Sequence, residues 1–505
     1  MTTYHMSISI QITPATERIP FTVTEQADGG FHCVISEVEA TSIDRCEQAL
    51  LDLTYPAVRQ ALATHLSAVS LERARAQGVA GTVREDPHLY RVDGEVGRFE
   101  FTTYWIDRDG WCVYNTAREV FPPLGSKEWY LTHGYKELAM MTGATGKSYR
   151  KTTSYLNRFR HQENDGTPVR TLREQTRREG EALQQAIEQQ VETLFEVHHI
   201  PRSGLLTALP QGLPIPVETT RESPLVVEAL TVCQTAAPGG TCLKDNPVAY
   251  EVPRTTVNVC LDDVGTKRQK AIRAAVSATS EAADTAKTVQ HTVAHVEQAG
   301  RRYVLTGSGL MATLRVLIAL FVHNSCLGYR LQFFTDGYRS LQKTIRQVFA
   351  WHPSVVIILD WYHLHKKCAN QLSLAMTGRD VRNAALKPLL HLLWYGLVDQ
   401  AIAAIKALDR TQVKNVRELE GLIGYLERNR PNIPCYAVRK RLGLRNSSQL
   451  GEKMNDLVVA DRQKRRGMSW SEAGSVALAS LTALVKNGEI AHWLQEGRLK
   501  FKLAA

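Results

Sequence analysis

Strand-like and helix-like segments alternate through the middle of this chain, and that alternation restricts the fold more than any other feature. VNVCLDD (257–263), YRLQFFTDG (329–337) and VVIILDWYHL (355–364) are apolar runs typical of buried strands. SGLMATLRVLIALFVHN (308–324) and SLQKTIRQVFAWH (340–352) have helical patterns. Strand–helix–strand alternation predicts an α/β fold with a buried, largely parallel sheet.

The flanking segments are predicted to be mostly helical. Alternating aromatic and β-branched residues at 89–114, with two Asp-Gly turns, predict a small β-hairpin module. A helix is expected at 44–76, and residues 365–440 have an almost entirely helical pattern. The segment 269–299, rich in Ala, Thr and Glu, is expected to form an elaborated helix or an excursion. Prolines at 201–224 predict an extended linker or a covering loop.

Length and charge limit the classes of protein to consider. At 505 residues the chain is too long for one hydrophobic core, and we expect three or four domains. A net charge of +10 suits a polyanionic partner, although a merely basic soluble protein fits the charge equally well. Without an apolar run of 18 residues, no membrane span is expected. Nine scattered cysteines that never form CxxC indicate a reducing compartment.

Aspartates end two of the predicted strands. Asp262 closes the first and Asp336 the second, and each alone fits a turn residue or a ligand equally well. Neighbouring strands would place the two carboxylates side by side, where their repulsion is tolerable only with a bound cation. Asp263 is the adjacent alternative to Asp262, and strand alternation puts the two on opposite faces, so only one of them can be the ligand.

A third carboxylate, Glu452, stands far downstream at the head of a helix-like segment. Three carboxylates provide only oxygen ligands, which fit two Mg²⁺ or Mn²⁺ ions rather than zinc. Such a site activates water or a 3′-hydroxyl for in-line displacement at a phosphodiester. Asp360 and His363 form a second constellation, which either holds this site or only caps the turn after a strand.

Two basic segments are candidate DNA contacts. Arg462, Lys464, Arg465 and Arg466 follow Glu452 and offer a phosphate-contacting surface, or a solvated face. GTPVRTLREQTRREG (166–180) is expected to be a helix that Gly180 ends. Preceded by a helix at 147–159, it predicts a helix-turn-helix (HTH). The residues that this helix would present to a DNA groove are Arg170, Arg173 and Arg177. A solvated Arg/Glu helix is the alternative.

Two other patterns are interpreted as structural. HTVAH (291–295) has histidines at helical spacing but no glutamate after the first, so it is not a metalloprotease motif. Cys260 has no base near it in the sequence and is expected in the core rather than as a nucleophile.

These motifs resemble those of DDE transposases of bacterial insertion sequences, in particular the Kra-like and Lre-like groups and more distantly the Mutator-type enzymes. FFTDG followed by LDWYHLHKK resembles the second-aspartate strand and the "LD-aromatic-YH" element of the family. The run from Glu452 through Arg462, Lys464 and Gly467-Met468-x-Trp470 resembles its glutamate helix. The resemblance covers about residues 255–495. The chain departs from the family in having Asp262-Asp263 for Asp-Gly, and no Gly-Ser-Gly before the glutamate.

The resemblance implies an RNase H-like core with a helical insertion before the glutamate. Asp262, Asp336 and Glu452 would then be the catalytic and metal-binding residues. The expected organisation is an α+β region with the β module, an HTH-like region, a linker, the first part of the core, the helical insertion and C-terminal helices. Their bounds, in this order, are 1–125, 126–200, 201–254, 255–365, 366–445 and 446–505.

The expected activity is transposition: the protein would bind the terminal inverted repeats, cut the DNA and join strands. Its partners would be double-stranded DNA and a second copy of the chain, in a homodimer or higher oligomer. We expect it in the bacterial cytoplasm, associated with the nucleoid. The alternatives are an RNase H-like endonuclease that does not join strands, and a non-enzymatic DNA-binding protein derived from a transposase.

Overall fold

The fold is described from a computed structural model. The described residues are 22–25, 31–34, 43–76, 81–83, 88–108, 110–116, 121–122, 124, 128–208, 223–240, 243, 250, 253–269 and 287–504. The protein is mixed α/β and divides into two compact units. Residues 1–143 with 148–173 make up the first unit, and residues 144–147 with 174–505 the second.

The first unit confirms the predicted helix at 44–76 and the β module at 89–114. Its elements are β1 (Thr22–Glu25), β2 (Phe31–Val34), α1 (Ile43–Ala76), β3 (Thr82–Val83), β4 (His88–Gly94), β5 (Gly97–Thr103), β6 (Trp105–Arg108), β7 (Trp111–Asn115), β8 (Tyr130–Leu131), α2 (His133–Thr145), α3 (Tyr149–Phe159) and α4 (Val169–Val197). The last residues of α2 and most of α4 belong to the second unit. The β module forms two small sheets, ordered β5-β4-β8 and β3-β6-β7.

A buried carboxylate organises the first unit. Asp93 of β4 is fully buried and pairs with the buried Arg160, while Arg98 Nε donates to it at 2.8 Å. Thr167 Oγ1 donates to the same carboxylate at 3.0 Å. Since a buried charge is tolerated only when it is paired and hydrogen-bonded, Asp93 fixes the hairpin against the segment that joins α3 to α4.

The second unit is built on one five-stranded sheet. Its elements are α5 (Pro224–Ala236), η2 (Pro238–Gly240), η4 (Pro253–Thr255), β9 (Thr256–Lys267), β10 (Thr288–Gln298), β11 (Arg301–Gly307), α7 (Leu310–His323), η6 (Cys326–Gly328), β12 (Arg330–Thr335), α8 (Arg339–Val348), β13 (Val355–Leu359), α9 (Trp361–Ala375), α10 (Arg379–Trp394), α11 (Val398–Lys406), η7 (Arg410–Gln412), α12 (Val416–Asn429), η8 (Arg430–Asn432), α13 (Tyr436–Arg441), α14 (Gln449–Asn455), η9 (Asp456–Lys464), α15 (Glu472–Lys486) and α16 (Ile490–Glu496). The strand order is β11-β10-β9-β12-β13.

The sheet is mixed, and the prediction of a largely parallel sheet holds for only part of it. β9, β12 and β13 are parallel, whereas β10 and β11 are antiparallel to their neighbours. Residues 288–298, expected within an elaborated helix or excursion, form β10 instead. Valine and threonine recur along this strand, and their preference for a half-buried pleated surface outweighs the pattern that suggested a helix.

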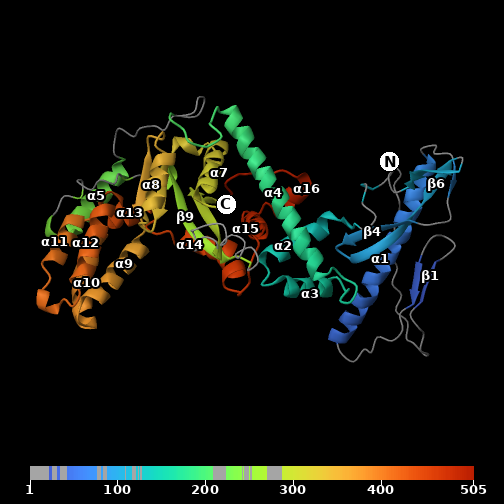
Figure 1. Ribbon diagram of the computed structural model, residues 1–505, viewed down its shortest axis with the longest axis horizontal. Coiled ribbons are helices and arrows are strands. Elements are labelled where there is room, and N and C mark those ends of the chain that lie inside the picture. Colours follow the sequence, from blue (N-terminus) through green and yellow to red (C-terminus); the bar gives the residue numbers. More distant parts are fainter. Residues whose placement is uncertain are drawn as a thin grey trace. The chain divides into compact units, whose positions relative to one another are not determined.

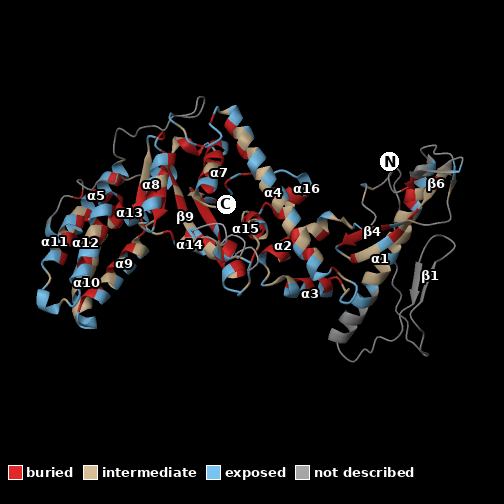
Figure 2. Ribbon diagram, in the orientation of Figure 1, coloured by how far each residue is buried: buried red, intermediate tan, exposed pale blue. Residues whose placement is uncertain are grey.

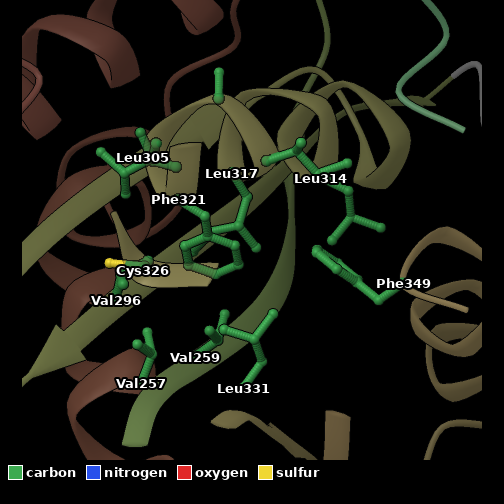
Figure 3. Close-up of a cluster of buried hydrophobic side chains, with 14 of the residues drawn as sticks. Val257, Val259, Val296, Leu305, Leu314, Leu317, Phe321, Cys326, Leu331 and Phe349 are labelled. Atoms are coloured by element: carbon green, nitrogen blue, oxygen red, sulfur yellow. The ribbon is translucent and has the colours of Figure 1, made fainter. Parts of the chain in front are cut away.

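One face of the sheet is covered by α7. Leu314, Leu317 and Phe321 of this helix are fully buried against Val257 and Val259 of β9 (Figure 3). The side chains of β9 alternate between the two faces, so odd-numbered residues from 257 to 261 belong to this core. The even-numbered residues of β9 therefore face the opposite side of the sheet.

The opposite face is covered in two parts. Val264 of β9 packs with Val458 and Val459 of η9 and with α15. Phe334 of β12 and Ile358 of β13 pack with α9 to α13, which gather beside the sheet in Figure 1. The helical pattern predicted for residues 366–445 is confirmed by helices α9 to α13. No helix in the described ranges is long and apolar enough to cross a bilayer.

One predicted boundary is wrong. Gly180 does not end the helix that begins near 168, because α4 continues to Val197. A Cβ at Gly180 would lie 2.5 Å from the carbonyl oxygen of Ala477 in α15, so glycine is present here for close helix packing rather than termination. Within the expected linker, α5 is a helix packed on α13 through Val226 and Leu230, while residues 209–222 lie outside the described residues.

Replacing Gly180 should destabilise the second unit. In an exposed helix, glycine to alanine gains about 1 kcal/mol, but the Gly180→Ala methyl would clash with Ala477. We expect the melting temperature to fall. Gly421→Ala is the matched control, because Gly421 is exposed on α12 and its Cβ would meet only Gln371 Nε2, at 3.4 Å. Equal or higher stability for both variants would contradict the packing role of Gly180.

Candidate active site

Asp262 and Asp336 occupy matching positions on two neighbouring parallel strands. Cys260 of β9 is paired in register with Phe334 of β12, and each aspartate stands two residues further along its chain. Asp336 directly follows β12, as predicted. Asp262 does not close its strand, because β9 continues to Lys267 and Asp262 pairs with Val293 of β10. The antiparallel partner β10, which the sequence analysis did not predict, accounts for this longer strand.

Asp262 and Asp263 point to opposite faces of the sheet, as strand alternation predicts. Asp262 is half-buried on the α14 side and accepts a hydrogen bond from Asn455 Nδ2 at 2.5 Å. Asp263 is exposed and accepts from Thr292 Oγ1 of β10, also at 2.5 Å. Since α14 carries Glu452, Asp262 is the aspartate of the pair that can act together with that glutamate.

Gly451 allows α14 to lie directly on β9. A Cβ at this position would lie 2.4 Å from Cys260 Cβ, which is closer than side chains pack. The residue that follows is Glu452, in the first turn of α14. Cys260 is buried as expected for a core residue, and burial raises the pKa of its thiol to about 12. The Gly451-Glu452 pair therefore combines close packing with a carboxylate above the strand of Asp262.

His363 connects α9 to the glutamate. Its Nε2 lies 2.6 Å from Glu452 Oε1. The backbone N–H of His363 in turn donates to Asp360 Oδ1 at 2.8 Å, because Asp360 caps the first turn of α9. This contact brings His363 to the candidate site, in accordance with the prediction from sequence.

Asp360 is fully buried and connects two elements. While its Oδ1 caps α9, its Oδ2 accepts hydrogen bonds from the backbone N–H and, at 2.9 Å, from the hydroxyl of Ser448, the residue before α14. Both carboxylate oxygens are thus occupied by protein donors. The helix-capping alternative is confirmed, and the same carboxylate also holds the start of the helix that carries Glu452.

Asp336 is exposed and forms its own turn. Its Oδ1 accepts from the backbone N–H of Tyr338 at 2.8 Å, which is the turn-forming role of an aspartate before glycine. In the described part of the chain, no three His, Cys, Asp or Glu side chains gather into a metal-binding group. Glu452 is instead engaged by His363 and Asp262 by Asn455. The donor chemistry of the three carboxylates still fits Mg²⁺ or Mn²⁺.

The environment of Asp262 disfavours a negative charge. Burial raises the pKa of its carboxyl above the ordinary value, and the nearby charges of Glu452 and Asp263 raise it further. Hydrogen bonds from Asn455 and from the backbone N–H of Asp263 act in the opposite direction. A cation beside Asp262 would remove this cost, since it compensates the repulsion between the carboxylates.

Asn455 is a site residue that the sequence analysis missed. It lies three positions after Glu452 on α14, is 7% exposed and donates to Asp262. Its Oδ1 is buried and accepts no hydrogen bond from the described residues. The signal was available in the sequence, because residues at i and i+3 share one helix face, so Glu-x-x-Asn places an amide beside the glutamate.

The predicted basic surface after Glu452 is only partly exposed. Lys464, Arg465 and Arg466 are exposed; Arg465 pairs with Asp456 at 2.6 Å, and Arg466 with Asp461 at 3.1 Å. These exposed ion pairs are weak, so phosphates can replace them.

Arg462 is 3% exposed and does not belong to this surface, which corrects the prediction. It lies on η9, a π-helical segment whose Val458 and Val459 pack against the sheet.

The three arginines predicted on the basic helix lie on α4 and differ in their environments. Arg170 and Arg173 are exposed. Arg177 forms ion pairs with Glu174 at 2.6 Å and with Glu181 at 2.7 Å. The two glutamates on the same helix largely neutralise the charge of Arg177, so this residue is less suited to contact DNA. That Arg170 and Arg173 contact DNA stays a prediction.

No protein-family model matches the chain, and no curated protein matches its sequence. Residue chemistry and geometry are therefore the basis for assigning a function.

Removing the charge of Asp262 should stabilise the fold. In EDTA at pH 7, Asp262→Asn should raise the melting temperature by about 2 °C, because the charged carboxylate of the wild type is disfavoured by burial. When folding raises the pKa of a carboxyl, the folded state loses stability as the pH rises from the carboxyl's pKa in the unfolded chain to its pKa in the folded protein. The gain should therefore vanish below about pH 4. Asp263→Asn, on the opposite face, should show little change; an equal gain in both variants would contradict the assignment.

Proposed function

We propose that this protein is a DNA transposase with an RNase H-like catalytic core. The observation that carries the proposal is the arrangement of its carboxylates. Asp262 and Asp336 stand at matching positions on neighbouring parallel strands, and Glu452 lies on a helix packed directly over the strand of Asp262. The five-stranded mixed sheet, with the first strand of the unit at its centre, supports an RNase H-like core.

Asp262, Asp336 and Glu452 would hold two Mg²⁺ or Mn²⁺ ions. When bound, such ions activate a hydroxyl or water and stabilise the leaving oxygen of a phosphodiester. The protein's own contribution is positional. Asp360 holds the start of α14, and His363 contacts Glu452 through its ring Nε2 and orients it. Asn455 orients Asp262 through one oxygen.

The partner in this proposal is duplex DNA. The net charge of +10 favours a polyanion, and the exposed Lys464, Arg465 and Arg466 follow the glutamate helix closely in sequence. Cutting and joining two ends of an element requires two active sites, so the working form would be at least a dimer on DNA.

Cleavage and joining of DNA ends test the proposal. The substrate is a labelled duplex carrying either end of the DNA that flanks the gene for this chain, incubated with Mg²⁺ or Mn²⁺ and a target plasmid. Wild-type protein should nick the end and join it to the plasmid. Asp336→Asn and Glu452→Gln should each lower the rate by more than about 100-fold, whereas Asp263→Asn should retain activity.

The other outcomes identify the alternatives. Metal-dependent cutting without joining would indicate an RNase H-like endonuclease. Binding without cutting, unchanged in both carboxylate variants, would indicate a non-enzymatic DNA-binding protein. Equal loss in Asp263→Asn and in the other variants would contradict the proposed ligand set.

Substituting His363 should lower the cleavage rate measurably, but less than substituting one of the carboxylates. His363→Ala should lower the cleavage rate about 10–100-fold, as expected for a residue that orients a metal ligand. His365→Ala is the matched control, because His365 is exposed two positions along the same helix and forms a ring contact with Trp361. Equal effects of the two substitutions would contradict the role of the Glu452 contact.

A further inference from the structure

The pair α2 and α3 has the dimensions of a helix-turn-helix. α2 ends at Thr145 and α3 begins at Tyr149, so three residues, including a glycine, join them. Ser148 caps α3, its Oγ accepting from the backbone N–H of Lys151 at 3.2 Å. By contrast, nine residues separate α3 from α4, the helix that the sequence suggested would enter a DNA groove.

The inner side of α3 is fixed to the first unit. Thr152, Thr153, Leu156 and Asn157 are buried. Asn157 makes two hydrogen bonds with the backbone of Thr167, donating to its carbonyl at 3.0 Å and accepting from its N–H at 2.9 Å. α3 is therefore held in one rotation about its axis, with a defined outer face.

The outer face of α3 is basic and aromatic. Its exposed residues are Arg150, Lys151, Ser154, Tyr155, Arg158 and Phe159. Tyr155 is 61% exposed and Phe159 72%, which is unusual for large aromatic side chains. The sequence of α3 contains no acidic residue, so its three cations have no carboxylate on their own helix, unlike Arg177 of α4. Figure 2 shows α3 with buried and exposed residues side by side.

We propose that the outer face of α3 enters the major groove of duplex DNA and reads the ends of the element. This inference rests on the proposed function and names the surface that selects the substrate. In helix-turn-helix proteins the N-terminal part of the second helix contacts base edges. Arg150 and Ser154, one turn apart, would read bases, and Arg158 would contact a phosphate. Duplex DNA is favoured as occupant because three exposed cations on one face, none of them in an ion pair with another described residue, match a polyanion.

Fluorescence anisotropy with the full-length protein tests this inference. The probes are a duplex carrying an end of the DNA flanking its own gene and a scrambled duplex of equal composition, both in EDTA. Arg150→Ala should reduce the preference for the end duplex about tenfold, while Arg158→Ala should weaken binding to both duplexes and lower the salt slope by about 1. Arg417→Ala, at an exposed arginine of α12, is the matched control and should keep the preference.

The outcomes separate this inference from the proposed function. If Arg150→Ala and Tyr155→Ala keep the full preference for the end duplex, the assignment of α3 is overturned, while metal-dependent cleavage can still stand. Loss of self-association without any change in DNA binding would instead assign the face to a second copy of the chain. If wild-type protein neither prefers its ends nor cuts them, both proposals fail. Unchanged thermal melting of each variant shows that the exposed substitutions leave the fold intact.

Discussion

The contact of α14 with β9 is the constraint on which the candidate site depends. Glycine at 451 is needed because any side chain there would overlap Cys260, and the thiol is itself buried under the helix. The next residue, Glu452, is consequently held over the same strand that carries Asp262. The charge of Glu452 contributes to the raised pKa of Asp262, so the two carboxylates influence each other across this contact. An arrangement that is costly without a cation is what a site for Mg²⁺ or Mn²⁺ requires.

Buried polar groups fix the loop that leads into α14. Asp360 receives both donors of Ser448, and the backbone N–H of Trp361 donates to the carbonyl of Asn446 at 3.0 Å. Arg439 of α13 is fully buried and donates to the carbonyl of Arg445. Burial lowers the pKa of this arginine to about 10. Because such groups are stable only with partners in place, they select one path for the loop. Contacts from α13 and from the start of α9 thereby fix the loop that precedes the glutamate.

The sequence predicted individual strands and helices better than it predicted the contacts between segments that lie far apart in the chain. Apolar runs predicted β9, β12 and β13, because buried strands consist mostly of apolar residues. The Gly-Glu pair predicted the start of α14. β10 was missed because the segment 269–299 that contains it is rich in alanine and glutamate, which suit a helix, whereas the strand depends on its antiparallel neighbours. Gly180 was misread as a helix end, because the atom that excludes a side chain belongs to Ala477, far away in sequence. Arg462 was placed on the surface for a similar reason: a local charge run does not show which side of a helix is buried.

The most direct test of the proposed site is to locate manganese in crystals of the full-length protein. Diffraction data collected at the manganese absorption edge identify the metal without reference to activity. We expect one or two anomalous peaks between Asp262 and Asp336, with Glu452 as a ligand and metal–oxygen distances of about 2.0–2.3 Å. Crystals of Asp262→Asn should lack them, whereas Asp263→Asn should keep them. At saturating Mn²⁺, the absence of a peak at Asp262, or a peak at Asp263 on the opposite face, would contradict the assignment.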